Sequence, residues 1–500
     1  MREIEHSGRP ANIIGIDLGT TEVRVARFNL VGLPEITSNA EGNNVTPSVV
    51  QIDGHGNVVI GQEAKKFLGT GTDNIFAEFK REIGSEKIWL AGATIVSPVT
   101  LTAMLLRKVV ADYAEQFGKP TDIAITWPAN YRNEQREATK TAARLAGLTN
   151  PLFIEEPIAA ALYYARSHSL QGKYLIYDFG GTTFNISLIE SDGDTISVIY
   201  QDGVQQLGEK DLNYALLTII GEKFRAQTGD EFDAIDCNLD ILVIENNLSS
   251  LCTRETVQIR LVSARNGVVS IEVSRTEFES GAAYLIKQAE MACENVLRCG
   301  HEDPSRHILK SEIKGVFLTG SAARVPAIQT SVQQLFGMPP KVERPEQAIA
   351  MGAAIFAAHR SSAGPLTPLQ RRAIDSTQIA DVSPHYYGII YTNWLTGEST
   401  NLTVIRKGEK LPLSRTYKVN ADSRGHLPVI SLTQSAIEEA NPDFVTRIWE
   451  GEHHRCAPNA QLNLTFGYDE FGMMCFSVTE VATGKYTKVD LRPSSDEHRS

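Results

Sequence analysis

The sequence predicts an α/β fold of two lobes around a cleft, followed by a β-sandwich domain. A duplicated strand–turn–strand motif and an alternation of strands with helices up to about residue 360 predict the two lobes. From Val382 onward, short β-rich runs replace the helical pattern, which predicts the sandwich. The chain has 500 residues, 42% apolar and 22% charged, an ordinary globular composition with room for more than one domain.

The central motif is the stretch 174–190, YLIYDFGGTTFNISLIE, which predicts two strands joined by a tight turn. The first strand ends near Asp178, and a glycine pair follows. A carboxylate at a strand end can hold Mg²⁺, while glycines let backbone N–H groups approach phosphate oxygens. The stretch 13–28, IIGIDLGTTEVRVARF, repeats this design around Asp17, which indicates an internal duplication.

A single aspartate turn of this kind is more often structural than functional, but two copies favour a ligand site. Aspartic proteases also carry paired aspartate turns, with threonine or serine between the aspartate and the glycine. Here Leu18 and Phe179 fill that position, so we do not expect a protease. A third glycine turn at 317–326, FLTGSAARVP, follows an apolar run, as expected for a loop on the far wall of a nucleotide cleft.

Charge, cysteine content and hydropathy exclude several classes of protein. A net charge of -12 without a sustained basic patch argues against general nucleic-acid binding. The six cysteines form no CxxC pair and no metal-binding spacing, so we expect reduced, mostly packed thiols. Residues 1–11 are polar, without a signal-peptide pattern, and no window approaches a membrane span. We therefore expect a cytoplasmic protein that binds neither nucleic acid nor membranes.

The pattern between the two aspartate motifs predicts one long helix in detail. Pro98 suits the first position of this helix, whose apolar face comprises Leu101, Leu105, Val109 and Tyr113.

Local physics alone gives ordinary interpretations of several charged residues. Lys80, in the segment FKREIG, is expected to be a solvated surface charge. Asn133 is expected to cap a helix that carries Arg136. Glu155 and Glu156 precede an alanine-rich helix, where carboxylates are favoured by the helix dipole, so capping is the simplest explanation for both.

The sequence predicts an ATPase-like part at 12–360, a linker at 361–381 and a β-sandwich at 382–490. The linker loses hydrophobic periodicity and gains serine, proline and glycine. The strands predicted in the sandwich are Tyr386–Thr392, Thr400–Ile405, Arg415–Asn420, Val429–Thr433, Ala460–Tyr468 and Cys475–Val481.

Eight motifs resemble those of the DnaK-type heat shock protein 70 (Hsp70) family and occur in its order. They are GIDLGTT, FKREIG, AITWPANY, QREATKTAARLAGL, EEPIAAALYYA, YDFGGTTFNIS, GSAARVP and EQAIAMGAA, and together they cover about residues 12–360. The β-rich part is similar, more loosely, to the peptide-binding β-subdomain of that family. The resemblance implies an actin-like (ribonuclease H-like) ATPase whose slow hydrolysis is coupled to the binding of extended apolar peptide.

The resemblance also implies roles for individual residues. Asp17 and Asp178 would hold Mg²⁺ and its waters, Lys80 would reach the γ-phosphate, and Glu156 would help to place the attacking water. Thr20 and Thr183 would bond phosphate oxygens. The further nucleotide-binding positions implied are Gly19, Thr21, Gly180, Gly181, Thr182, Gly208, Ser249, Gly320, Ser321 and Arg324.

Four departures from the family pattern fall near the phosphate positions. Thr182 stands where the family has a third glycine. Asn185 replaces an aspartate that binds a monovalent cation, so K⁺, if used, is expected to bind weakly. Glu209 and Ser321 each replace a glycine of a phosphate-facing loop.

Other departures affect the base pocket and the partners. The family's adenine clamp presents glutamate, lysine and arginine, where this chain has Leu242, Glu245 and Asn246, with Ser249 kept. We expect looser ATP binding and weaker discrimination between ATP and GTP. The arginine that receives J-domain proteins falls at Leu152, so little response to a generic J-domain protein is expected.

Two function classes stay open. One is an ATP-driven chaperone with ATP/ADP and Mg²⁺ as cofactors and unfolded or extended peptides as clients. A nucleotide-exchange factor is a further possible partner of this class. No helical lid pattern precedes Ser500, so a lidless member is expected. The other is a regulatory or binding relative that senses nucleotide without a productive chaperone cycle. Pro128 and Arg136 match the family's relay between cleft and peptide domain, and the β-rich part disfavours the related sugar kinases and filament proteins.

Overall fold

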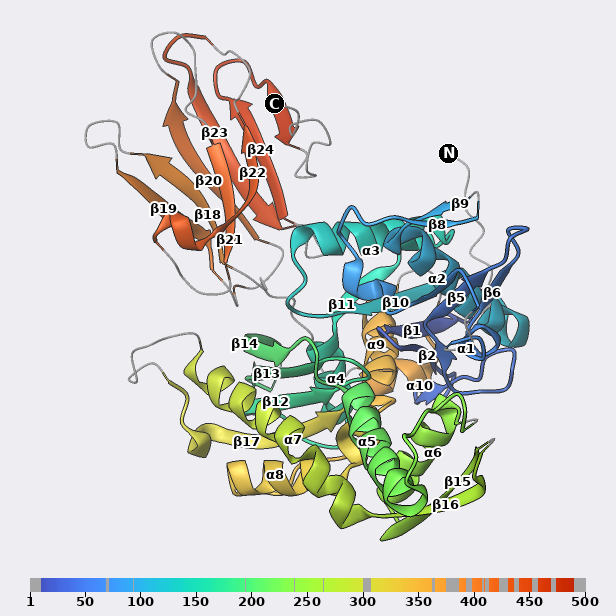
Figure 1. The fold of residues 1–500 in the computed structure, drawn as a ribbon. Coiled ribbons are helices and arrows are strands. Elements are labelled where there is room, and N and C mark those ends of the chain that lie inside the picture. Colours follow the sequence, from blue (N-terminus) through green and yellow to red (C-terminus); the bar gives the residue numbers. More distant parts are fainter. Residues whose placement is uncertain are drawn as a thin grey trace.

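A computed structural model of the 500-residue chain shows two sheets with flanking helices and an all-β part at the C-terminal end (Figure 1). It describes residues 10–68, 72–92, 94–193, 195–237, 239–263, 265–299, 307–361, 365–374, 386–392, 398–406, 409, 413–421, 430–435, 440–451, 457–468 and 474–489. Among these residues, no helix combines the length and the apolar character that a membrane crossing requires.

The first sheet is mixed and has six strands. In spatial order they are β11 (Leu152–Glu155), β10 (Asp122–Trp127), β1 (Ile13–Leu18), β2 (Glu22–Phe28) and β3 (Pro34–Ile36), with β4 (Thr46–Pro47) paired to β2. β1 runs antiparallel to β2 and parallel to β10. Nearly every residue of β1 is buried, as expected for a central strand covered on both faces.

The second sheet repeats this arrangement. Its strands in spatial order are β14 (Ile196–Val204), β13 (Phe184–Ser191), β12 (Gly172–Phe179) and β17 (Ile313–Thr319). β12 runs antiparallel to β13 and parallel to β17. In both sheets the strand that carries the motif aspartate lies between its hairpin partner and a parallel strand, so the predicted duplication is confirmed in the topology.

Two helices, α4 (Glu156–Ala165) and α9 (Ala348–His359), join the sheets. They form one apolar core with Ile13 of the first sheet and with Ile176 and Phe317 of the second (Figure 1). The two sheets are therefore joined by one continuous apolar core.

The remaining long helices cover one sheet each. With the first sheet pack α2 (Pro98–Phe117) and α3 (Asn133–Leu145). Four helices pack against the second sheet: α5 (Glu209–Thr228), α6 (Ile241–Leu251), α7 (Arg275–Arg298) and α8 (Pro326–Phe336).

The helix predicted to start at Pro98 is confirmed. Ser97 and Thr100 form its capping box, and the four residues of its predicted apolar face are buried. The predicted cap at Asn133 is wrong by one residue, because Asn133 is the first residue of α3 and Arg132 precedes it.

Short elements complete the two lobes. They are β5 (Val49–Ile52), β6 (Val58–Ile60), α1 (Gln62–Lys65), β7 (Ile75–Ala77), the 3-10 helix η1 (Phe79–Glu82), β8 (Trp89–Ala91), β9 (Thr94–Val96), β15 (Thr256–Ser263), β16 (Gly267–Ser274) and the 3-10 helices η3 (Lys310–Glu312) and η4 (Ser321–Arg324).

The C-terminal part forms two four-stranded antiparallel sheets. One has the order β19 (Ser399–Ile405), β18 (Tyr386–Thr392), β21 (Ile430–Ser435) and β22 (Thr446–Gly451), with the 3-10 helix η5 (Pro442–Phe444) between β21 and β22 in the chain. The other has the order β20 (Leu413–Asn420), β23 (Gln461–Tyr468), β24 (Met474–Glu480) and β25 (Tyr486–Val489). Both sheets contribute to one apolar core, in keeping with the predicted β-sandwich.

Each of the six strands predicted here overlaps an observed strand, although Val429 lies outside the described residues. β22 and β25 were not predicted.

The predicted linker, 361–381, includes the helix α10 (Pro368–Ile374). The Thr367 hydroxyl donates to the carbonyl of Leu30, and the Gln370 amide donates to the carbonyl of Phe28, so this helix docks on the first lobe. Residues 375–381 lie outside the described part of the chain. The domain boundaries remain a prediction.

Candidate functional site

The two aspartate turns and the third glycine turn line one cavity between the sheets. Residues that are far apart in the sequence meet there, and most of the predicted site residues are among them. Those that line this inner cavity are Asp17, Gly19, Thr20, Thr21, Lys80, Glu156, Asp178, Gly180, Gly181, Thr182, Thr183, Gly320 and Ser321.

A threonine on the neighbouring parallel strand orients each aspartate. The Thr126 hydroxyl, on β10, donates to Asp17 Oδ1 at 3.2 Å. The Thr319 hydroxyl, on β17, donates to Asp178 Oδ1 at 2.8 Å. Because β10 and β17 occupy equivalent places in the two sheets, the duplication includes these orienting hydroxyls. Sequence reasoning missed both, although each lies near the end of an apolar run next to a recognised motif.

The pKa values of the two aspartates are raised, although the charge of Lys80 acts in the opposite direction on both. Burial, followed by the nearby Glu156 carboxylate, raises the pKa of Asp17 to about 7. The same two causes raise the pKa of Asp178 to about 7. A bound cation would favour the ionised forms.

This donor set fits Mg²⁺. In the described residues, no group of three or more acidic, histidine or cysteine side chains could hold a metal by itself. Mg²⁺ commonly takes one or two carboxylates together with waters and substrate phosphates. Asp17 and Asp178 therefore suit an ion that is shared with a phosphate ligand.

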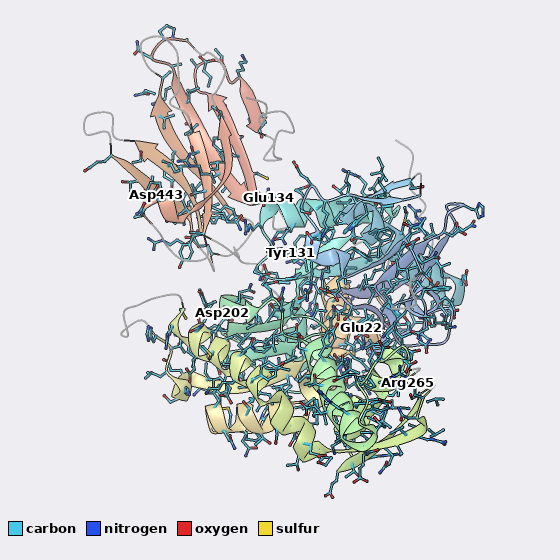
Figure 2. The ribbon with its side chains drawn as sticks, in the orientation of Figure 1. Glu22, Tyr131, Glu134, Asp202, Arg265 and Asp443 are labelled. Atoms are coloured by element: carbon cyan, nitrogen blue, oxygen red, sulfur yellow. The ribbon has the colours of Figure 1, made fainter. Side chains whose placement is uncertain are left out.

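Lys80 lies inside the cleft, so its interpretation as a solvated surface charge is wrong. It is only 5% exposed, and its Nζ donates to the carbonyl of Leu18 and lies 3.1 Å from Glu156 Oε1. The ring of Tyr131, labelled in Figure 2, lies 5.8 Å from the same nitrogen. Burial alone would lower the pKa of Lys80, but the carboxylates of Glu156 and Asp17 hold it above its ordinary value, so the ammonium stays charged.

Neither glutamate at the start of α4 acts as a helix cap. Glu155, the residue before the helix, makes no capping hydrogen bond. Its Oε1 instead lies 2.9 Å from Nη2 of Arg136, and the Arg136 guanidinium lies 4.8 Å from the ring of Trp127. Glu156 pairs with Lys80 as described above. The capping explanation fails because both side chains meet buried cations from distant segments.

Glycine is required at three positions in these loops, because neighbouring backbone or side-chain atoms lie too close for a Cβ. A Cβ on Gly181 would lie 2.2 Å from Thr21 Oγ1, and one on Gly320 would lie 2.1 Å from the carbonyl oxygen of Phe179. A Cβ on Gly208 would lie 2.4 Å from the backbone nitrogen of Thr182. Gly208 does not line the inner cavity or the larger outer cavity described below. It packs against the backbone of the Gly181–Thr182 turn instead.

The outer part of the cleft is a larger cavity of about 920 Å³, within the usual size of ligand pockets. The predicted residues Ser249 and Arg324 line it, together with Glu245 and Asn246 of the altered base clamp. Leu242 does not line it, because α6 turns this side chain elsewhere.

Two ion pairs connect the lobes around this outer cavity. Lys65 Nζ, on α1, lies 2.8 Å from Glu245 Oε2, on α6. Lys210 Nζ, on α5, lies 2.5 Å from Glu78 Oε1, just before η1. Arg324 is also paired, with Glu346.

Two buried polar atoms on the cleft walls have no hydrogen-bond partner. They are the Thr182 hydroxyl oxygen and Asn213 Oδ1, on residues that line the inner and the outer cavity respectively. A buried polar atom without a partner is costly, and an ordered water, or a small shift that exposes the atom to a ligand, would satisfy it.

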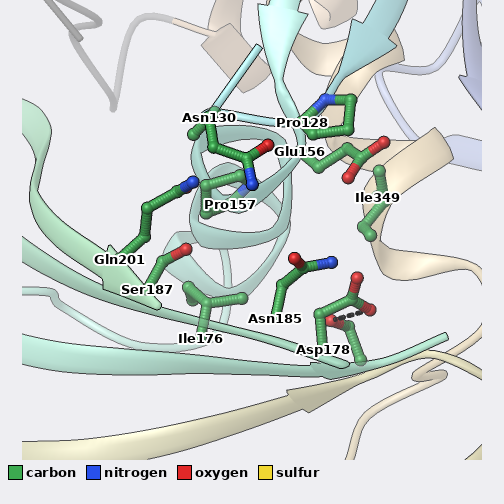
Figure 3. A pocket seen from close by; sticks show the side chains of 12 residues that line it. Pro128, Asn130, Glu156, Pro157, Ile176, Asp178, Asn185, Ser187, Gln201 and Ile349 are labelled. Carbon is green, nitrogen blue, oxygen red and sulfur yellow. Dashed lines mark hydrogen bonds between the residues drawn. The ribbon is translucent and has the colours of Figure 1, made fainter. Parts of the chain in front are cut away.

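A small pocket adjoins the inner cavity and shares Glu156 and Asp178 with it. Glu156 and Asp178 approach it from opposite sides, and Asn185 lies between them (Figure 3). The resemblance aligns Asn185 with a cation-binding aspartate, and a neutral amide attracts a cation less strongly than a carboxylate does.

The chain matches the family model described as Hsp70 protein over residues 13–90 and 87–500. These two matches together extend from the first strand of the first sheet to the last residue of the sequence.

Proposed function

The chain belongs to the Hsp70 protein family, and from this premise we propose that it is a slow, Mg²⁺-dependent ATPase of the chaperone type. One observation carries the proposal. The buried ion pair of Lys80 and Glu156 lines the same cavity as the two aspartates and acts electrostatically on both, which suits a site for the terminal phosphate of a cleft-bound nucleotide.

The proposed chemistry is mostly positioning and charge neutralisation, which phosphoryl transfer requires. The Lys80 ammonium is fixed by Glu156 and by the Leu18 carbonyl, so it can neutralise a developing phosphate charge without rearranging. Glu156 can accept a hydrogen bond from the attacking water, and Thr183 and Thr20 can donate to phosphate oxygens. Mg²⁺, when held by Asp17 and Asp178, would supply further charge neutralisation.

We also propose that the β-sandwich binds extended apolar peptides and that nucleotide turnover controls this binding. The family assignment supports this step, together with the all-β architecture of residues 386–489. Cytoplasmic location is part of the same proposal. The cysteines Cys237, Cys252 and Cys293 are free thiols, which suits a reducing compartment.

A second candidate is a family member that senses nucleotide without a productive cycle. The carboxylates of Glu209 and Glu245 favour it, since both line the outer cavity and would oppose an anionic ligand.

Single-turnover hydrolysis of ATP, with and without an unfolded client protein, tests the proposal. We expect slow Mg²⁺-dependent formation of ADP, at a rate that the client changes. Nucleotide binding without hydrolysis would instead support the sensing relative. Failure to bind ATP and ADP at millimolar concentrations would contradict both candidates.

A further inference from the structure

Glu209 places a carboxylate inside the nucleotide cleft. It is the first residue of α5, and its side chain reaches across to the third glycine turn, where the Ser321 hydroxyl donates to Glu209 Oε2. Both residues line the outer cavity, and Ser321 also lines the inner one. This hydrogen bond therefore crosses the junction between the two cavities.

The backbone N–H groups of residues 208–210 all donate hydrogen bonds within the protein. Its N–H donates to the carbonyl of Gly180 at 2.9 Å, and the N–H of Lys210 donates to the carbonyl of Gly181 at 2.9 Å. The N–H of Gly208 donates to the Asp211 side chain at 2.8 Å. The first turn of α5 is thus tied to the aspartate turn. Two carboxylates, Glu209 and Asp211, lie at the positive end of this helix, and Asp211 is the one that accepts from the backbone.

Nearby cations are committed to other carboxylates. Lys65 pairs with Glu245, Lys210 with Glu78, and Arg324 with Glu346. Within the part of the chain that the structure describes, Glu209 forms no ion pair. Burial raises the pKa of Glu209, while the hydrogen bond from Ser321 acts in the opposite direction; the carboxylates of Glu22 and Glu245 add to the rise, and the charge of Lys65 opposes it.

The position of this carboxylate matters for any nucleotide that spans both cavities. Its terminal phosphate would lie near Lys80 in the inner cavity, and its base would lie in the outer cavity. The phosphates nearer the ribose must then pass the junction that the Glu209–Ser321 hydrogen bond crosses.

We propose that Glu209 is a specificity-determining residue whose carboxylate opposes the binding of the nucleotide phosphates nearer the ribose. This inference rests on the proposed nucleotide site. A nucleoside diphosphate or triphosphate must detach Glu209 from Ser321 or bind beside a like charge, whereas a nucleoside without phosphates meets no such opposition. The residue therefore weakens the binding of phosphorylated ligands selectively.

Calorimetric titration of the full chain with ADP and with adenosine, in the presence of Mg²⁺, tests the proposal. Glu209→Gln keeps the size of the side chain and an acceptor for Ser321 but removes the charge. Glu209→Ala removes the side chain, and Glu63→Gln removes a charge from an exposed ion pair on α1 as the matched control. Both Glu209 variants should bind ADP on the order of tenfold more tightly, because a repulsion between like charges is relieved. Adenosine binding and the control should be unchanged.

Three results would overturn the inference. Unchanged or weaker ADP binding by both Glu209 variants would leave the nucleotide site intact but give Glu209 a merely structural role. An equal gain for adenosine would show that the effect does not involve phosphate. Absence of ADP binding in all variants and in the parent would overturn the proposed function together with this inference. A thermal melt of each variant confirms that folded proteins are compared.

Discussion

The inner and outer ends of the cleft differ in how closely they keep the predicted nucleotide machinery. At the inner end, Asp17, Asp178, Lys80 and Glu156 are present, and each is held by another side chain. At the outer end, Glu245 occupies a position where the family presents a cation, and it is bonded to Lys65 across the cleft.

This difference separates two properties that are often treated together. Under the proposed function, the inner residues would act on the reacting phosphate and so determine the rate of hydrolysis. The outer residues would act on the base, the ribose and the phosphates nearer the ribose, and so determine affinity and selectivity. A chain can therefore keep the chemistry while its hold on the ligand is altered, and each prediction below addresses one end.

The largest effect is expected from Lys80→Ala, at the inner end. Removing a buried ammonium that faces the reacting phosphate should slow single-turnover hydrolysis by roughly 10²–10³-fold, as the loss of other charge-stabilising groups does. Nucleotide affinity should change little, because the outer contacts are intact. Lys87→Ala is a suitable control, since that lysine forms an exposed pair with Glu82. Hydrolysis at the parent rate would disprove the assignment of Lys80.

A smaller effect is expected from the threonines that orient the aspartates. Thr319→Val and Thr126→Val remove hydroxyl donors to carboxylates, bonds worth about 1.5–3 kcal/mol each. The Mg²⁺ concentration for half-maximal hydrolysis should rise by roughly tenfold, more for Thr319, whose bond is shorter. Thr218→Val serves as the control, because that hydroxyl bonds only within α5. An unchanged Mg²⁺ requirement in both variants would show that the aspartates need no such support.

The two ends of the cleft also differ in how far sequence could predict them. The aspartate turns are local signals, because strand periodicity, an acidic residue and glycines occur within a few positions. The two-lobed arrangement followed from their repetition, whereas the strand order was not predicted. The threonine partners could not be predicted in this way, since Thr126 meets Asp17 only when β10 pairs in parallel with β1.

Tertiary contacts also reversed the local interpretation of charged residues. Lys80 stands in a short polar segment that is typical of a surface, yet η1 inserts it beneath Tyr131 and against Glu156. Glu155 directly precedes a helix, where the dipole favours a carboxylate, but its side chain pairs with Arg136 of α3 instead. Burial of charge depends on partners from elsewhere in the chain, and sequence windows carry no information about them.

Base selectivity, at the outer end, should show the smallest effect. An arginine stacked on adenine contributes roughly 0.5–2 kcal/mol. Among the described cavity-lining residues, Lys65 and Arg324 are each paired with a carboxylate. The walls here are mainly apolar, with Ile244 and Leu248 on α6, and apolar contacts discriminate weakly between purines.

We therefore expect the dissociation constants for ATP and GTP to differ by less than about tenfold, which corresponds to about 1.4 kcal/mol. Calorimetric titration with both nucleotides measures this ratio directly. Glu245→Gln should shift both constants in the same direction, because the carboxylate repels the phosphates that ATP and GTP share. Strong rejection of GTP would show that polar groups such as Asn213 Oδ1, which has no partner in the cavity wall, read the edge of the base. In that case the outer end of the cleft would select the base by hydrogen bonding. The outer end would then depart from the predicted nucleotide machinery only in how tightly it binds the nucleotide, and no longer in base selectivity.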